Sequence, residues 1–279
     1  MPVDTSSAFG HYANCKLARL VWTICNHARL SASVRKKLRK IFAHRLKGPF
    51  DVNVAGINWR LYPEQNYCDR VIFSRNHMPE QKEHKALDKI IKADMCFVDI
   101  GSNVGTYSLY LAIKSPQARI LALEPQPETF QKLLFNLKAN AVDNVTALQL
   151  GCGPTRHTMK LWSGGSNTGN TSLLEKGTAN PEKAFEVPVV PLLELLDEHH
   201  FQRIDLLKID IEGYEDQALA PFFLNAKKAL WPRYVLIETA HQEFWQQNII
   251  DLMLAEDYHA VFNTDENVIL KHESNPKLK

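Results

Sequence analysis

Residues 97–105, FVDIGSNVG, place one carboxylate and two glycines between a short apolar run and the start of a helix. Glycine lets a backbone approach a ligand closely and adopt positive φ, and a helix start offers free N–H groups to a polar ligand. The spacing G-x-N-x-G lacks the third glycine of a dinucleotide fingerprint, and Asp99 suits the amino group of a methionine moiety but would repel a pyrophosphate. We therefore expect a cofactor loop formed by Asp99, Gly101, Ser102, Asn103, Gly105 and Thr106. The alternative is an ordinary strand-to-helix turn in which Asp99 is a cap.

A second acidic residue, Glu124, ends the next predicted strand, 19 residues after Gly105. An acid in this register can accept both hydroxyls of a ribose, as it does in nucleotide-binding α/β folds. Glu124 is therefore a candidate cofactor residue. The alternative is a surface glutamate before a proline turn.

Two later strands also end in side chains that can do chemistry. Asp210 and Glu212 lie two residues apart, so they share one strand face, at the edge where open parallel sheets form their sites. Glu238 and His241 follow the strand after that. A neutral imidazole can take a proton from a substrate hydroxyl, because histidine titrates near working pH. The alternative for His241 is a polar surface residue.

The elements around these motifs alternate between strand and helix. We expect strands at 96–100, 119–123, 144–150, 205–211 and 234–237, and helices at 106–114, 127–140, 192–199 and from 214. This alternation predicts βαβ units and a parallel sheet. The last two strands, 259–263 and 268–272, are too close for a crossover helix and must pair antiparallel. A parallel sheet that closes this way is typical of a class I methyltransferase, whereas a dinucleotide dehydrogenase would keep a parallel crossover.

Other segments are expected to frame this core. Residues 50–62 predict a hairpin, residues 82–93 and 242–256 predict helices, and Pro221 is expected to interrupt the helix that contains it. Residues 163–172 are rich in Gly, Ser, Asn and Thr, which predicts a mobile loop over the site. We place the domain boundary after residue 49, with a basic helical extension at 1–49 and a catalytic domain at 50–279, divided into 50–93 and 94–279.

The extension carries most of the positive charge. Residues 1–50 hold ten Lys or Arg and one acid, Asp4. The rest of the chain has a net negative charge, so that the net charge of the whole chain is only +2. Apolar residues recur at helical spacing within the segment. It can pack on the main domain with a solvated basic face, or residues 16–47 can contact an anionic membrane surface or an acidic partner. Nucleic acid is not expected as a partner, because the following body is acidic.

The composition is that of a globular protein, with 45% hydrophobic and 23% charged residues, which excludes disordered, collagen-like and coiled-coil classes. No run of roughly 18 apolar residues predicts a membrane span. The five cysteines include no CxxC pair, so neither a zinc site nor a disulfide framework is expected. We expect a cytoplasmic protein, with contact at the inner membrane surface as the second interpretation of residues 16–47.

The order of four blocks, FVDIGSNVGTYSL, ALEPQPETFQKLLFNLKAN, LLKIDIEGYEDQAL and VLIET, resembles the FkbM family of S-adenosylmethionine-dependent methyltransferases over about residues 97–240. The resemblance implies a Rossmann-like class I methyltransferase fold with a mostly parallel seven-stranded sheet and an antiparallel last strand. It implies O-methylation of a sugar, glycan or natural product. Asp99, Gly101, Asn103, Gly105 and Glu124 match the family's cofactor segment, and Asp210 and Glu212 match the block that faces methyl transfer.

The mechanism expected from these residues is methyl transfer to a hydroxyl oxygen that must lose its proton. His241 is the expected base, with Asp210 and Glu212 as competitors. Asp210, Glu212 and Glu238 could instead hold a Mg²⁺ ion through oxygen ligands. Two rival functions remain, an NAD-dependent oxidoreductase and a non-catalytic binding module with a basic arm. The sequence selects neither the methyl acceptor nor the oligomeric state.

Overall fold

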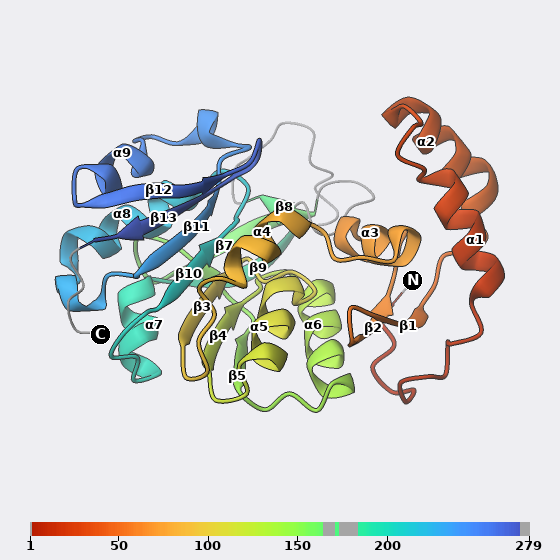
Figure 1. Cartoon of the computed structure of the whole chain (residues 1–279), viewed down its shortest axis with the longest axis horizontal. Coiled ribbons are helices and arrows are strands. Elements are labelled where there is room, and N and C mark those ends of the chain that lie inside the picture. The colour runs from red at the N-terminus through yellow and green to blue at the C-terminus, as the bar shows by residue number, and fades with distance from the viewer. Residues whose placement is uncertain (1, 164–170, 173–183, 274–279) are drawn as a thin grey trace.

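The computed structural model describes residues 2–163, 171–172 and 184–273 of the chain. Its centre is a seven-stranded sheet in the order β12-β13-β11-β10-β3-β4-β5 (Figure 1). The strands are β3 (Cys96–Ile100), β4 (Arg119–Leu123), β5 (Val145–Leu148), β10 (Leu206–Ile209), β11 (Tyr234–Glu238), β12 (Tyr258–Asn263) and β13 (Asn267–His272). Strand β3 is buried along its whole length, as the continuous apolar run CFVDI predicts for a central parallel strand.

The sheet has the class I methyltransferase arrangement. Strand β3 pairs parallel with both β4 and β10, and β10 pairs parallel with β11. Strand β13 enters between β11 and β12 and runs antiparallel to both. The predicted α/β fold class and antiparallel last strand are therefore confirmed.

Helices cover both faces of the sheet and make three layers. Val98 and Ile100 of β3 belong to the core cluster with α7 (Leu192–Glu198), α8 (Glu215–Asn225) and α9 (Ile249–Leu254). Phe97, on the opposite face, packs with α4 (Gln81–Leu87) and α5 (Thr106–Lys114). Helix α6 (Pro127–Ala139) lies beside α5 (Figure 1). Alternate side chains of the strands point to the two faces of the sheet, and helices cover both faces. The carboxyl edge of the sheet is therefore the place left for a ligand.

A second sheet, in the order β6-β9-β7-β8, follows the third core strand along the chain. Its strands are β6 (Gly151–Cys152), β7 (His157–Ser163), β8 (Thr171–Ser172) and β9 (Ala184–Val190). The sequence predicts only the last of these strands, as a short strand at 185–190. Most of the loop predicted at 163–172 lies outside the described residues.

The N-terminal segment packs on the main domain. Helix α1 (Lys16–Cys25) lies against α3 (Tyr67–Arg75), and it is followed by α2 (Ala32–Leu38), a π-helix at Arg39–Ala43 and the hairpin of β1 (Phe50–Val54) and β2 (Ile57–Leu61). Trp22 is buried and its Nε1 donates to the Leu46 carbonyl at 2.7 Å. Figure 1 shows α1 and α2 at the outer edge of the molecule. The domain boundary after residue 49 stays a prediction.

Three expected elements differ from the structure. Helix α8 continues through Pro221, so the expected interruption was wrong. The helix predicted at 82–93 ends at Leu87. The one predicted at 242–256 is split into a short 3-10 turn, Gln242–Phe244, and α9, because Asp216 accepts the backbone N–H groups of Gln246 and Gln247. In the described ranges, no helix has the length and apolar character needed to cross a bilayer.

Candidate active site

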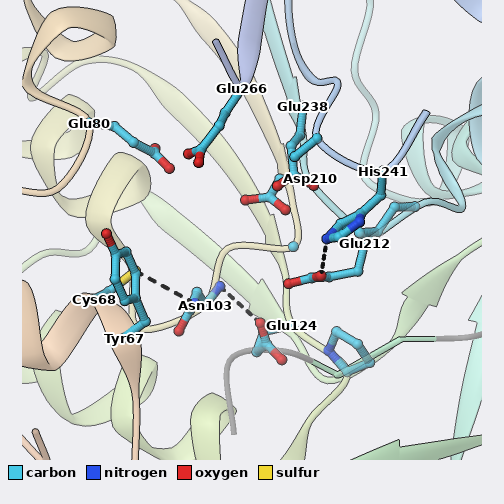
Figure 2. A pocket seen from close by; sticks show the side chains of 14 residues that line it. Tyr67, Cys68, Glu80, Asn103, Glu124, Asp210, Glu212, Glu238, His241 and Glu266 are labelled. Carbon is cyan, nitrogen blue, oxygen red and sulfur yellow. Dashed lines mark hydrogen bonds and ion pairs between the residues drawn. The ribbon is translucent and has the colours of Figure 1, made fainter. Parts of the chain in front are cut away.

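A cavity of about 420 Å³ opens at the carboxyl edge of the central sheet (Figure 2). This volume lies within the range of about 300–1,000 Å³ that small-molecule sites occupy. Six of the described residues that line it are acidic: Glu80, Glu124, Asp210, Glu212, Glu238 and Glu266. Such a wall creates a negative potential that favours a cationic ligand over an anionic one.

The glycine loop reaches this cavity through Gly101 and Asn103. Gly101 has a φ of +78°, and a Cβ there would lie 2.0 Å from the Asp210 carbonyl oxygen. No other residue therefore fits this close approach between the loop and the end of β10. The backbone N–H groups of Gly101 and Ser102 both donate to the Leu123 carbonyl, at 3.0 and 2.9 Å, which holds the loop against the end of β4.

Glu124 lines the cavity and is 7% exposed. Its Oε2 accepts the Asn103 N–H at 2.9 Å, and its Oε1 accepts the Gln126 N–H at 2.9 Å. Burial raises the pKa of Glu124 to about 7, although both N–H groups oppose the rise. The carboxylate is thus fixed by the backbone, and each oxygen keeps further capacity to accept a ligand hydroxyl.

Asp99 lies beneath the glycine loop rather than among the residues that line the cavity. It is fully buried, its Oδ2 accepts the Ser108 hydroxyl at 2.5 Å, and its Oδ1 lies 3.7 Å from Lys208 Nζ. Lys208 Nζ also lies 3.6 Å from Asp210 Oδ2 and donates to the Gly101 carbonyl at 2.7 Å. Lys208 therefore ties the loop to the site carboxylates. Direct contact of Asp99 with a ligand amino group stays a prediction.

Burial alone would lower the pKa of Lys208, but the carboxylates of Asp210 and Asp99 raise it above its usual value. Lys208 is opposite Asp99 in the parallel pairing of β10 with β3. A buried cation with two carboxylate partners is held charged at neutral pH. It fixes the loop and the end of β10 as one unit.

The other three residues of the predicted cofactor loop, Ser102, Gly105 and Thr106, do not belong to the described lining of the cavity. Ser102 and Thr106 are buried. Gly105 immediately precedes α5 and has a φ of +95°, and a Cβ there would lie 2.8 Å from a Leu133 methyl group. Their assignment to cofactor binding stays a prediction.

His241 and Glu212 form a pair across the cavity from Tyr67 and Cys68 (Figure 2). His241 Nε2 lies 3.0 Å from Glu212 Oε2. Glu212 has a φ of +59°, in the left-handed region that costs a non-glycine residue free energy. Strained backbone of this kind concentrates at functional sites. The turn aims the carboxylate at the imidazole.

Glu238 lies beside this pair and Asp210 (Figure 2). Burial, followed by the negative charges of Asp210 and Glu212, raises the pKa of Glu238. Its Oε2 is buried without a hydrogen-bond partner among the described residues. Within the same ranges, no group of three or more His, Cys, Asp or Glu side chains is placed to hold a metal ion. The Mg²⁺ site expected at Asp210, Glu212 and Glu238 is thus without support.

Sequence reasoning missed several residues of the site. Glu80 and Glu266 line the cavity from outside the core motifs, as do Tyr67 and Cys68. Nothing in the local sequence marks these four. Lys208 could have been found, because it precedes Asp210 by two residues and so shares its strand face.

Comparison with known proteins identifies the family of this chain. Residues 99–263, more than half of the chain, match the methyltransferase FkbM domain. The chain belongs to the FkbM methyltransferase family. A methyltransferase from Sordaria araneosa, sdnD, is 33% identical over an alignment of 150 residues that covers 44% of this chain and 58% of that protein. The hexuronic acid methyltransferase AglP from Haloferax volcanii is 27% identical over 142 residues, which cover 50% of this chain and 55% of that protein.

The FkbM chain thus spans little more than half the length of these curated relatives. Among solved structures, the precorrin-6y C5,15-methyltransferase from Geobacter metallireducens matches 71% of this chain and 90% of its own, with a TM-score of 0.44 and 14% identity.

Proposed function

We propose that this chain is an S-adenosylmethionine-dependent O-methyltransferase that acts on a hydroxyl group of a sugar, a glycan or a small natural product. The observation that carries the proposal is the placement of Glu124 and the Glu212–His241 pair around one acidic cavity. Family membership supports methyl transfer, and the name of the Haloferax volcanii relative supports a sugar-like acceptor.

The residues around the cavity fit S-adenosylmethionine. Its sulfonium and ammonium groups are cationic, and the acidic wall suits both. Gly101 lines the cavity, and the absence of a side chain there lets the loop lie directly against the end of β10. Glu124 is fixed by two backbone N–H groups and presents a carboxylate for the ribose hydroxyls. A pyrophosphate would meet this acidic wall with little compensating positive charge, which argues against NAD.

The bound cofactor supplies a methyl group already activated on a sulfonium. The chain has to orient the acceptor hydroxyl, exclude water and take up one proton. In our proposal the Glu212–His241 pair takes the hydroxyl proton as the new oxygen–carbon bond forms: the proton goes to a carboxylate oxygen of Glu212, and His241 positions this carboxylate by donating from Nε2 to Oε2. Asp210, held by Lys208, is the competing proton acceptor.

Binding of the two rival cofactors tests this proposal. Because a ligand of the native state raises its melting temperature, S-adenosylmethionine should raise that of the full chain while NAD leaves it unchanged. Incubation with methyl-labelled cofactor and a cell extract should then yield a product heavier by one CH₂. Stabilisation by NAD alone would reject the methyltransferase assignment. Stabilisation by S-adenosylmethionine without any labelled product would favour the non-catalytic binding module.

We also propose that residues 16–47 dock this enzyme on an anionic membrane surface. Six large apolar side chains of this segment are between 42% and 71% exposed: Leu17, Leu20, Ile24, Val34, Ile41 and Phe42. All ten Lys and Arg residues of the first 50 positions lie in the same segment. An apolar face with basic neighbours matches the interface of an anionic bilayer.

Vesicle binding checks this second proposal. The full chain should sediment with vesicles that contain phosphatidylglycerol but not with pure phosphatidylcholine. Leu20→Gln with Ile24→Gln should weaken the binding about tenfold or more, because burial of each side chain is worth on the order of 1.5–3 kcal/mol. Leu224→Gln with Leu254→Gln is the matched control, since both leucines are exposed elsewhere. Equal loss in the two double variants would contradict a docking face on α1.

A further inference from the structure

A second cavity, of about 180 Å³, lies between the N-terminal helices and α3. Four arginines line it: Arg35 of α2, Arg39 of the π-helix, and Arg70 and Arg75 of α3. We call it the arginine pocket. The side chains of Asn26 and Ser74 add buried polar wall to it. Four guanidinium groups around a small hollow present an anion with donors from several sides.

The positive charge of the arginine pocket is not neutralised by the described part of the chain. No carboxylate there lies within ion-pair distance, 4.0 Å, of any of the four guanidinium groups. Arg39 Nη1 donates to Asn26 Oδ1 at 2.8 Å, and Arg70 Nη1 donates to the Pro63 carbonyl at 3.3 Å. These neutral partners orient the two side chains without cancelling their charge.

The arginines also repel one another. Burial, and then the charge of Arg35, lowers the pKa of Arg39, and burial, followed by the charge of Arg39, lowers the pKa of Arg70. An anion bound between them would relieve this repulsion. The planar guanidinium fork matches phosphate geometry in particular. The charge and shape of the pocket therefore favour a phosphate group.

The arginine pocket adjoins the candidate active site. Tyr67 lines both cavities, and Arg70 Cζ lies 5.5 Å from the centre of its ring. On the active-site side of Tyr67 the wall is acidic, and on the other side it is basic. A phosphate is repelled by the first cavity and attracted by the second. This division of charge gives a phosphorylated acceptor one orientation across Tyr67.

We propose that the arginine pocket binds the phosphate group of the methyl acceptor, so that the acceptor is a phosphate ester whose hydroxyl enters the acidic cavity. The assignment of this acceptor class rests on the function proposed above. The phosphate ester can be soluble, such as a sugar phosphate, or it can be the phosphate-bearing headgroup of a lipid. Both carry the same recognised group, and the experiment below separates them.

Titration of the full chain with inorganic pyrophosphate tests the pocket without a known acceptor. Arg35→Gln with Arg75→Gln should weaken binding between about tenfold and a hundredfold, because each removed charge-assisted hydrogen bond contributes strongly. These two arginines have no side-chain hydrogen bond in the described structure whose loss would endanger the fold. Arg29→Gln with Arg45→Gln removes the same charge from exposed positions of the same basic segment and should bind as the wild type does.

The outcomes separate this inference from the proposed function. No heat from pyrophosphate, or equal affinity in the two double variants, would overturn the phosphate site, even where S-adenosylmethionine still binds. Failure of S-adenosylmethionine to bind would overturn the proposed function, while a pyrophosphate site sensitive to Arg35 and Arg75 would stand as an anion site without an acceptor role.

Labelled-methyl transfer to a cell extract then identifies the source of the phosphate. We expect pyrophosphate to inhibit the wild-type reaction, and the Arg35→Gln, Arg75→Gln variant to react more slowly than its control. Label in the organic phase assigns the phosphate to a lipid headgroup, and label in small aqueous products assigns it to a soluble ester. Either result supports the pocket. Label recovered in RNA, or transfer unaffected by both pyrophosphate and the double substitution, would overturn the acceptor assignment.

Discussion

Glu124→Gln should weaken S-adenosylmethionine binding about a hundredfold or more, as measured by calorimetry on the full chain. In the proposed complex the carboxylate accepts two ribose hydroxyls, and each hydrogen bond to a charged group contributes on the order of 1.5–3 kcal/mol. Both carboxylate oxygens already accept a backbone N–H, so the amide NH₂ of glutamine must also face one of these donors. Glu128→Gln, on an exposed position of α6, is the matched control.

The affinity should also depend on pH in the wild type. The pKa of Glu124 is raised from 4.5 to about 7 by burial, so the free protein is protonated at this site below pH 7. Affinity for S-adenosylmethionine should therefore fall as pH decreases through 7, towards a limit of about tenfold per pH unit. Glu80, which lines the same cavity, also has a pKa raised to about 7 by burial. The pH dependence should persist in Glu80→Gln and disappear in Glu124→Gln.

The stability of the free protein should change in the opposite direction. Between pH 4.5 and 7 the unfolded chain releases the proton of Glu124 while the folded chain retains it. The folded state therefore binds more protons, and this residue's contribution to the free energy of unfolding decreases as pH rises through that window. An affinity for S-adenosylmethionine that is independent of pH in the wild type would contradict the role of Glu124.

Glu212→Gln and His241→Ala should each lower kcat for methyl transfer by about 10²–10⁴-fold, the usual contribution of acid–base catalysis. The reason is that the Glu212–His241 pair, joined at 3.0 Å, is the proposed acceptor of the hydroxyl proton. The binding of S-adenosylmethionine should change much less, because neither side chain is assigned to its ribose. Labelled-methyl transfer and calorimetry on the same variants measure the two effects separately.

Further variants of Glu243 and Glu212 separate the role of the pair from effects of charge and backbone strain. Glu243→Gln changes an exposed carboxylate 3.9 Å from the other nitrogen of His241, and it should leave kcat unchanged. Glu212→Gly should raise the free energy of unfolding relative to Glu212→Ala by about 1–2 kcal/mol, because glycine accepts the positive φ of this position without strain. Glu212→Gly and Glu212→Ala should both lose about 10²–10⁴-fold in kcat, as Glu212→Gln does. A Glu212 variant with wild-type turnover would remove the pair from the mechanism and leave Asp210 as the candidate base.

The core of the fold could be predicted from the sequence because its elements carry strong local patterns. The strand at 96–100, the helix at 106–114 and the strand at 119–123 match β3, α5 and β4 residue for residue. Each is a short apolar run or an apolar helix face bounded by Gly, Pro or a polar turn, and such boundaries act locally. The connection between the last two strands is too short for a crossover helix, which likewise predicted their antiparallel pairing.

The carboxylates of the site could be predicted in part for the same reason. Glu124, Asp210 and Glu238 lie at the ends of three predicted strands, and parallel strands bring their carboxyl ends to one edge. That rule placed these side chains near one another, and the structure brings them to one cavity. The rule does not predict how deeply each of these side chains is buried. Asp99 ends a strand of the same sheet, yet it lies under the loop with Lys208.

Only the tertiary structure decided the rest. Glu80 and Glu266 reach the cavity from segments far apart in the sequence, and the arginine pocket forms where α2 meets α3. The break between residues 244 and 249 arises because Asp216 binds the N–H groups of Gln246 and Gln247. Local patterns determine which residues form strands and helices. Contacts between distant segments, which depend on packing and charge in three dimensions, determine the shape and the electrostatics of both cavities.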